Sequence, residues 1–218
     1  SYGVSTAAAT LVARHRGAGD EPAVARVAWG SLGLVLALGL AFGLLGALGA
    51  DVVVHHVLGA KGVVRALAAA YLRVIVGGSV TAFVMFQLTA LLRALGDSRT
   101  PLAMIVVGNA LNLLLAVLFV YGPGEAPAIF AWGPPLARAL GVPRMEVVGA
   151  AWATLLARAL ACAVPLWLLR RRLRVAEHGA TLAPSREALR ALARLAWPTS
   201  AQFVVRVAAV LQIGRAHV

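Results

Sequence analysis

The sequence predicts an all-α, polytopic membrane protein, a bundle of helices that cross the bilayer. Of its 218 residues, 61% are hydrophobic and only 13% are charged, and the mean hydropathy is +0.87. A soluble domain is nearer half apolar and one quarter charged. Several uncharged runs of about 20 residues follow one another, and this is the length that a helix needs to cross the hydrocarbon core. These runs disfavour the alternative, a soluble protein with buried helices.

The chain opens on a small apolar stretch, residues 2–13, which we interpret as the end of a helix. Gly19 suits the C-terminal end of this helix, and Asp20 suits the cap of the next one. Residues 27–50 form an uncharged run that is rich in Leu, Gly and Ala. This run is long enough to span a bilayer with some tilt.

The centre of the chain predicts a transmembrane hairpin. Residues 74–92 and 101–121 carry no charge, and a short polar turn, residues 93–100, joins them. The first of these helices is expected to begin early, within 63–71. Pro101 suits the first turn of the second helix, because the N–H that proline lacks would be unpaired there anyway.

The rest of the chain alternates again between loops and apolar runs. Residues 122–143 hold several Pro and Gly residues and predict a surface loop with a short interfacial helix. Residues 147–169 are expected to span the membrane. Residues 170–194 are basic and polar, with Ser185 as the cap of a short amphipathic helix, and a further apolar segment opens at residues 196–212.

Positive charge alternates between connections, which is the pattern that sets the orientation of membrane proteins. Twelve Lys and Arg residues lie at 14–26, 93–99 and 170–194, against five at 61–73 and 138–144. The larger group predicts the cytoplasmic side. The net charge of +12 is not gathered on a soluble basic face with interleaved aromatic residues. The lipid bilayer, and not nucleic acid, is therefore the expected partner.

The chemistry-bearing residues do not predict an enzyme. Cys162 is the one cysteine and lies in an apolar run, so neither a disulfide framework nor a cysteine metal cluster is expected. His55 and His56 are adjacent and do not share a helix face, which makes them poor joint metal ligands. No nucleophile and base stand in a catalytic arrangement, and no cofactor is expected.

Four motifs, in register, resemble those of the multidrug and toxic compound extrusion (MATE) family of secondary transporters. Residues 10–20 read TLVARHRGAGD, like the loop after the family's second helix. Residues 93–102 read RALGDSRTPL and residues 108–112 read GNALN, like the turn between helices 4 and 5 and the fifth helix. Residues 148–154 (VGAAWAT) and 194–198 (RLAWP) resemble the starts of helices 6 and 7.

The resemblance implies a multi-pass transporter of the cell (inner) membrane, with twelve helices in two six-helix lobes. The family exports cationic, amphipathic organic compounds in exchange for H⁺ or Na⁺ by alternating access. The chain is then expected to be a piece that lacks its partner, the second lobe of the same protein. Four segments are expected: 1–176 with the end of helix 2 and helices 3–6, 177–195 as the cytoplasmic interlobe linker, 196–212 as the start of helix 7, and 213–218 as a translated sequencing adapter.

Two asparagines are the first candidates for an ion or substrate site. Asn109 and Asn112 lie near the middle of the 101–121 run and share a face with Ala116. Polar groups in hydrocarbon line a cavity or join helices, and residue type alone leaves both interpretations open. The resemblance favours Asn112, which stands where the family's cation-site Asn falls. Many members carry a carboxylate where this chain has Ala116, so the coupling carboxylate is expected on helix 1 or in the second lobe.

Three further residues are candidates for the lining of a cavity. Arg158 lies in the middle of its apolar run, with Thr154 and Cys162 one turn away on the same side. It is too central to reach the interface, so we expect it to face the lobe interior and to modulate ion coupling. Gln87 and Thr154 are also candidates, with ordinary helix packing as an equal alternative.

Two other functions stay open at this point. A flippase of lipid-linked sugars, from related families with similar lobes, would be favoured by an intramembrane basic lining, for which Arg158 is the one candidate. A membrane scaffold that does not transport is the alternative from a different class. Ion-driven dye efflux by the full-length protein excludes the scaffold.

Overall fold

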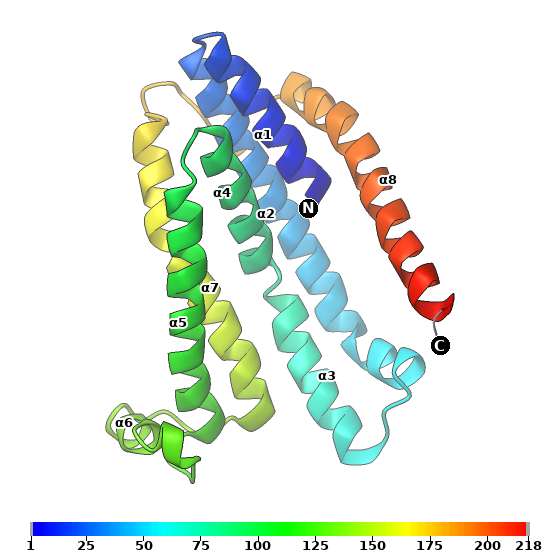
Figure 1. The fold of residues 1–218 in the computed structure, drawn as a ribbon, viewed down its shortest axis with the longest axis vertical. Coiled ribbons are helices and arrows are strands. Elements are labelled where there is room, and N and C mark those ends of the chain that lie inside the picture. The colour runs from blue at the N-terminus through cyan, green and yellow to red at the C-terminus, as the bar shows by residue number, and fades with distance from the viewer. Residues whose placement is uncertain (1, 217–218) are drawn as a thin grey trace. The chain divides into compact units, whose positions relative to one another are not determined.

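The computed structural model describes residues 2–216, which form helices and their connections without a strand in that range (Figure 1). The helices are α1 (Tyr2–Gly17), α2 (Glu21–Val52), α3 (Gly62–Gly77), α4 (Val80–Ala94), α5 (Arg99–Tyr121), α6 (Gly133–Ala139), α7 (Glu146–Arg172) and α8 (Arg186–Ala216). A π-helical turn follows α2 at Val53–Val57, and a 3₁₀ turn precedes α6 at Ala128–Phe130. The all-α prediction is confirmed, and α6 is the short helix predicted within 122–143.

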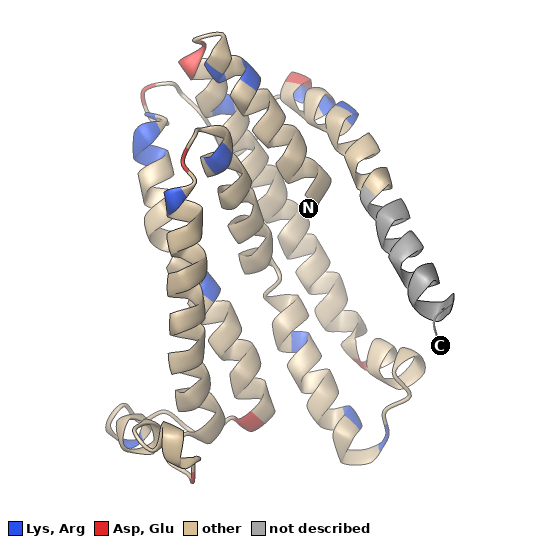
Figure 2. Cartoon of the chain, in the orientation of Figure 1, with Lys and Arg blue, Asp and Glu red and all other residues tan. Residues whose placement is uncertain are grey.

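Four stretches of the described residues are long and apolar enough to cross a membrane: Glu21–Val57, Gly62–Ala94, Arg99–Tyr121 and Glu146–Arg172. Most of their apolar side chains are not buried within the fold. In three of the four, only 22% of the most apolar window is buried, and Leu48 on α2 is 73% exposed. Exposed apolar surface on this scale marks contact with a membrane. Figure 2 shows the charged residues mostly near helix ends, with long uncharged stretches between them.

The span predicted at 74–92 consists of two helices, α3 and α4, which are joined at Gly78 and Ser79 (Figure 1). The predicted early start is confirmed, because α3 begins at Gly62. The break was not predicted. A Cβ on Gly78 would lie 2.8 Å from Cγ of Leu155 on α7, so the glycine leaves the space that this side chain fills. Tertiary packing therefore decides where the helix is interrupted.

The chain divides into two compact units. The first unit comprises the described parts of Ser1–Val35, Phe86–Ser98 and Leu168–Val218, and the second comprises Leu36–Met85 and Arg99–Trp167. Helices α2, α4 and α7 contribute residues to both. The first unit holds the connections that the charge pattern assigns to the cytoplasmic side, and the second holds α5 and most of α7.

The predicted boundary between α1 and α2 is confirmed residue by residue. Gly19 adopts a φ of 74°, the left-handed conformation that favours glycine. Its N–H donates to the carbonyl of Arg16, and the N–H of Asp20 donates to the carbonyl of His15. Asp20 then caps α2, because its Oδ1 accepts a hydrogen bond from the N–H of Ala23 at 3.0 Å.

The polar turn after α4 is held by two arginines within the first unit. Nη1 of Arg16, at the end of α1, donates to the carbonyl oxygen of Leu95 at 2.7 Å. Nη1 of Arg172, at the end of α7, lies 2.7 Å from Oδ2 of Asp97. Gly96, with a φ of 78°, lets the chain reverse between these two contacts. The turn is therefore fixed to the ends of two other helices.

Helix α8 is continuous, whereas the sequence predicted a short amphipathic helix and a separate segment from 196. The predicted cap is present, since Oγ of Ser185 accepts a hydrogen bond from an N–H of the first turn at 3.1 Å. Pro198 lies inside α8, where the sequence pattern favoured an interruption. Helix α1 packs along α8, and a Cβ on Gly3 would lie 2.6 Å from the carbonyl oxygen of Ala196. The continuity of α8 through Pro198 is thus accompanied by close packing against α1.

Candidate functional site

A polar contact joins α5 and α7 inside the second unit. Nδ2 of Asn112 donates to Oγ1 of Thr154 at 3.1 Å, and that hydroxyl donates to the carbonyl oxygen of Ala150 at 2.9 Å. Both side chains are half-buried. The hydroxyl proton is used within α7, so Thr154 serves Asn112 as an acceptor. The bond uses the amide nitrogen of Asn112, and its amide oxygen is the atom that can accept from a substrate or bind a cation.

The structure separates the two asparagines. Gly108 faces α7, since a Cβ there would lie 3.4 Å from Cβ of Ala161, and Asn112 lies one helical turn further along the same side. Asn109 is exposed instead. Ala116 is half-buried, one turn after Asn112, and offers no ligand atom. Of the two asparagines, Asn112 is therefore the one whose side chain contacts α7.

Gln87 lies in the first unit, apart from this contact. Its side chain is fully buried, and its Nε2 donates to Oγ of Ser31 on α2 at 2.8 Å. Ser31 in turn donates to the carbonyl oxygen of Ala28 at 2.9 Å. Oε1 of Gln87 is buried without a partner among the described residues. The contact joins α4 to α2, as interhelical hydrogen bonds do in membranes. Sequence reasoning missed Ser31, because one serine in a Leu- and Gly-rich run carries no signal.

Arg158 is half-buried within α7, and Cys162, one turn later, is buried. The ion pairs among the described residues do not include Arg158. The acids of the same part of the chain lie in connections or within the first or last two residues of a helix. The expectation that Arg158 faces the lobe interior and modulates ion coupling stays a prediction.

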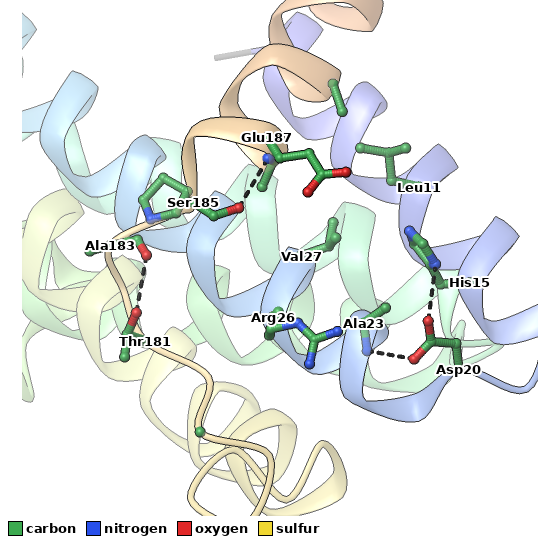
Figure 3. Close-up of a pocket in the computed structure, with 14 residues that line it drawn as sticks. Leu11, His15, Asp20, Ala23, Arg26, Val27, Thr181, Ala183, Ser185 and Glu187 are labelled. Atoms are coloured by element: carbon green, nitrogen blue, oxygen red, sulfur yellow. Dashed lines mark hydrogen bonds and ion pairs between the residues drawn. The ribbon is translucent and has the colours of Figure 1, made fainter.

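A cavity of about 400 Å³ lies in the first unit, among the end of α1, the start of α2, residues 179–185 and the start of α8 (Figure 3). The ionisable residues of its lining are His15, Asp20, Arg26 and Glu187. Nδ1 of His15 lies 3.8 Å from Oδ2 of Asp20. The charges of the lining oppose one another and select neither a cation nor an anion. None of the residues predicted to form a site lines this cavity.

The connection that leads into α8 packs closely against two glycines of α2. A Cβ on Gly30 would lie 3.1 Å from Cα of Pro184, and a Cβ on Gly33 would lie 2.6 Å from the carbonyl carbon of Leu182. Both neighbours are backbone atoms, which cannot rotate away as a side-chain end can. The two glycines therefore position this connection, and with it the start of α8.

Replacing Gly33 with alanine is expected to displace the connection from α2. We expect several-fold faster trypsin cleavage after the exposed Arg186 in the full-length protein, because a displaced segment opens more often. The matched control is Gly49→Ala on the same helix, where a Cβ meets nothing within 4 Å. Equal cleavage rates in the two variants would contradict the close packing of the connection against Gly33.

The sequence profile of the family described as MatE matches residues 1–118, which is more than half of the chain. The chain belongs to the MatE family. This confirms the resemblance to the multidrug and toxic compound extrusion family that the motifs predicted. The MatE chain is thus part of a multi-pass membrane protein of a transporter family, in agreement with its four apolar spans.

Two curated relatives of this MatE chain carry the name probable multidrug resistance protein NorM. The one from Deinococcus radiodurans is 38% identical over 197 residues, which cover 90% of this chain and 39% of the relative. The one from Thermotoga maritima is 28% identical over 207 residues, which cover 95% of this chain and 41% of the relative. The chain therefore spans about two fifths of the length of these relatives.

Solved structures of the same family share the fold of the MatE chain. An outward-facing multidrug resistance MATE family transporter matches with a TM-score of 0.70 at 28% identity, over 96% of this chain and 42% of that one. An inward-facing transporter of the same family matches with a TM-score of 0.68 at 27% identity, over 91% of this chain and 41% of that one. A transporter of the wider superfamily from Pyrococcus furiosus matches with a TM-score of 0.69 at 27% identity, over 96% of this chain and 42% of that one. That protein is described as having a binding pocket of reverse polarity, which suggests a different function for it.

Proposed function

We propose that the whole MatE protein is a secondary active antiporter that exports cationic, amphipathic organic compounds in exchange for H⁺ or Na⁺. Family membership carries this proposal. The relatives named as probable multidrug resistance proteins support the substrate class, and the four spans support a location in the cell membrane. The coupling ion is the only co-substrate proposed, without a cofactor. A second lobe of the same protein completes the cavity in this proposal.

The contact between Asn112 and Thr154 is the proposed point of ion or substrate binding in this chain. It is a polar pair within two apolar spans, and polar groups at membrane depth are costly unless they serve a cavity or a partner. Asn109 is a second candidate, because it is exposed on the same helix. Gln87 is assigned to helix packing through its bond to Ser31.

We place the coupling carboxylate outside the residues described here. Ala116 occupies the position one turn after Asn112 and can neither bind a proton nor supply a charged oxygen to Na⁺. The described acids lie at helix ends or in connections. Helix 1 or the second lobe is then the proposed source of the carboxylate.

Alternating access by rocking of one lobe against the other is the proposed mode of transport. In such a mechanism, a lobe keeps its internal fold while the protein changes from outward-facing to inward-facing. The TM-scores of 0.70 and 0.68 against structures in these two states support this, since the chain resembles both about equally.

Replacing Arg158 with glutamine is expected to change the pH dependence of transport. Removing a positive charge from the lobe interior lets a nearby carboxylate keep its proton to a higher pH. We therefore expect the curve of efflux against pH to move upward by about one pH unit. Arg138→Gln, on the exposed surface of α6, is the matched control. An unchanged curve for Arg158→Gln would contradict the coupling role.

The proposal is tested by ethidium efflux from an efflux-deficient host that expresses the full-length protein, with pH and sodium varied separately. Efflux that collapses with the proton gradient and ignores sodium supports proton antiport, with the carboxylate sought on helix 1. Loss of efflux without sodium indicates sodium antiport and a site in the second lobe. No efflux under either gradient, from a well-expressed protein, would overturn the proposal.

A flippase of lipid-linked sugars is the second candidate function. Arg158 favours it, because an arginine within an apolar span that has no described acid partner suits an anionic substrate. Transport of a lipid-linked sugar analogue without dye efflux would select this function over multidrug export.

A further inference from the structure

A basic cavity lies in the first unit, where three helices end and α2 begins. Its volume is about 570 Å³. The ionisable residues of its lining are Arg16, Arg172, Arg174, His178 and the single acid Glu21, with two leucines completing the wall. This lining differs from that of the cavity in Figure 3, where the charges oppose one another.

We propose that this cavity binds a phosphate group, supplied by the headgroup of an anionic phospholipid. Its position supports the source. Glu21 is the first residue of one apolar span and Arg172 is the last residue of another, so the cavity lies where hydrocarbon gives way to water. Basic pockets at this level between transmembrane helices are suited to acidic headgroups.

The fold positions two of the guanidinium groups and leaves most of their donors unused. Arg16 donates one N–H to the carbonyl of Leu95, and Arg172 donates one to Asp97. A guanidinium has five N–H donors in a rigid fork, which matches the oxygens of a phosphate. Each contact therefore orients its arginine and leaves the other N–H donors of the guanidinium available for a phosphate.

Arg174 adopts a backbone conformation that a glycine would adopt more easily. Its φ is 45°, at the point where α7 ends. Its N–H donates to the carbonyl of Arg171, and the next N–H, of Val175, donates to the carbonyl of Arg170, which is the Schellman pattern. The equivalent positions after α1 and α4 are glycines with positive φ. The chain thus places an arginine in the cavity wall at the cost of backbone strain, and such strain indicates a functional demand on the residue.

The acidic residues near the cavity do not neutralise the positive charge of its arginines. Glu177 pairs with Arg174 at 3.5 Å, but the two side chains are 66% and 69% exposed, and such pairs are weak. Asp97 accepts a hydrogen bond from Nη1 of Arg172, which leaves the other N–H groups of this guanidinium available. Glu21 is exposed, and further arginines occupy the last turns of α4 and α7. The surroundings of the cavity therefore favour an anion.

The test measures binding of phosphatidylglycerol, with phosphatidylcholine as the neutral lipid, to the full-length protein in detergent. Arg174→Gly is expected to weaken phosphatidylglycerol binding about fivefold, which corresponds to one arginine at a lipid surface. The Arg174→Gly variant is expected to keep the fold, because glycine adopts the left-handed backbone conformation at this position without strain. Arg174→Gln is the second variant, and it loses the charge while keeping the strain. Arg190→Gln, which removes one charge from the exposed surface of α8, should leave binding unchanged.

Inorganic phosphate is titrated in a separate arm to identify the source of the group. Binding of phosphatidylglycerol that phosphate does not displace, and that depends on Arg174, supports the lipid headgroup. Displacement by millimolar phosphate, again dependent on Arg174, supports the same site with a soluble phosphate as its ligand. Equal binding by Arg174→Gly, Arg174→Gln and Arg190→Gln would overturn the proposal, because the arginines then act only through the charge of this surface.

Discussion

The Asn112→Leu variant of the full-length protein is expected to lose about tenfold or more of its ethidium efflux while reaching the membrane normally. Leucine keeps the apolar character of α5 but removes both the donor to Thr154 and the amide oxygen proposed to bind the ion or substrate. Hydrogen bonds to charged groups contribute about 1.5–3 kcal/mol, which corresponds to a loss of tenfold or more. Initial efflux rates, normalised to the amount of protein in the membrane, measure the effect.

Two further variants separate a functional loss from a packing loss. Asn109→Leu makes the same chemical change three residues earlier, on an exposed side chain, and is expected to have a smaller effect. Adding Thr154→Val to Asn112→Leu should cause little additional loss, because groups that act through one contact are not additive. Equal losses from Asn109→Leu and Asn112→Leu would contradict the assignment of the site to Asn112.

The Gly43→Ala variant is expected to be destabilised by about 1–3 kcal/mol, the largest effect on stability that we predict. Gly43 is buried on α2 in the second unit, and a Cβ there would lie 2.5 Å from the carbonyl oxygen of Gly77 at the end of α3. That oxygen is a backbone atom, so α3 itself has to move. Thermal unfolding of the purified full-length protein measures the change.

Gly49→Ala provides the control on the same helix. A Cβ at Gly49 meets nothing within 4 Å, so alanine is expected to leave the protein unchanged or to stabilise α2 by about 0.5–1 kcal/mol. A fall in unfolding temperature for Gly43→Ala that is no larger than for Gly49→Ala would contradict the close approach of the two helices.

The helices themselves were predictable because hydrocarbon imposes a simple rule. A span needs about 20 predominantly apolar residues, and most of the charges lie in connections or near helix ends, so α2, α5 and α7 follow from the sequence. Local chemistry also fixed the caps at Asp20 and Ser185, where a side-chain oxygen accepts a hydrogen bond from the first turn. Family membership was predictable from motifs in register and is confirmed.

The remaining features depend on contacts between distant residues. The break at Gly78 follows from the packing of Leu155, and the continuity of α8 through Pro198 accompanies packing against α1. Asn112 and Thr154 were both predicted to line a cavity, but their pairing across α5 and α7 carries no local signal. The left-handed conformation of Arg174 could not be predicted either, because sequence patterns assign such a position to glycine.

The most direct test of the account is transport by the purified full-length protein in liposomes, with a pH gradient or a sodium gradient imposed across the membrane. We expect movement of ethidium against the direction of one of these ions, driven by that gradient and abolished when it is dissipated. Folded, correctly inserted protein that moves ethidium under neither gradient would contradict the proposed antiport.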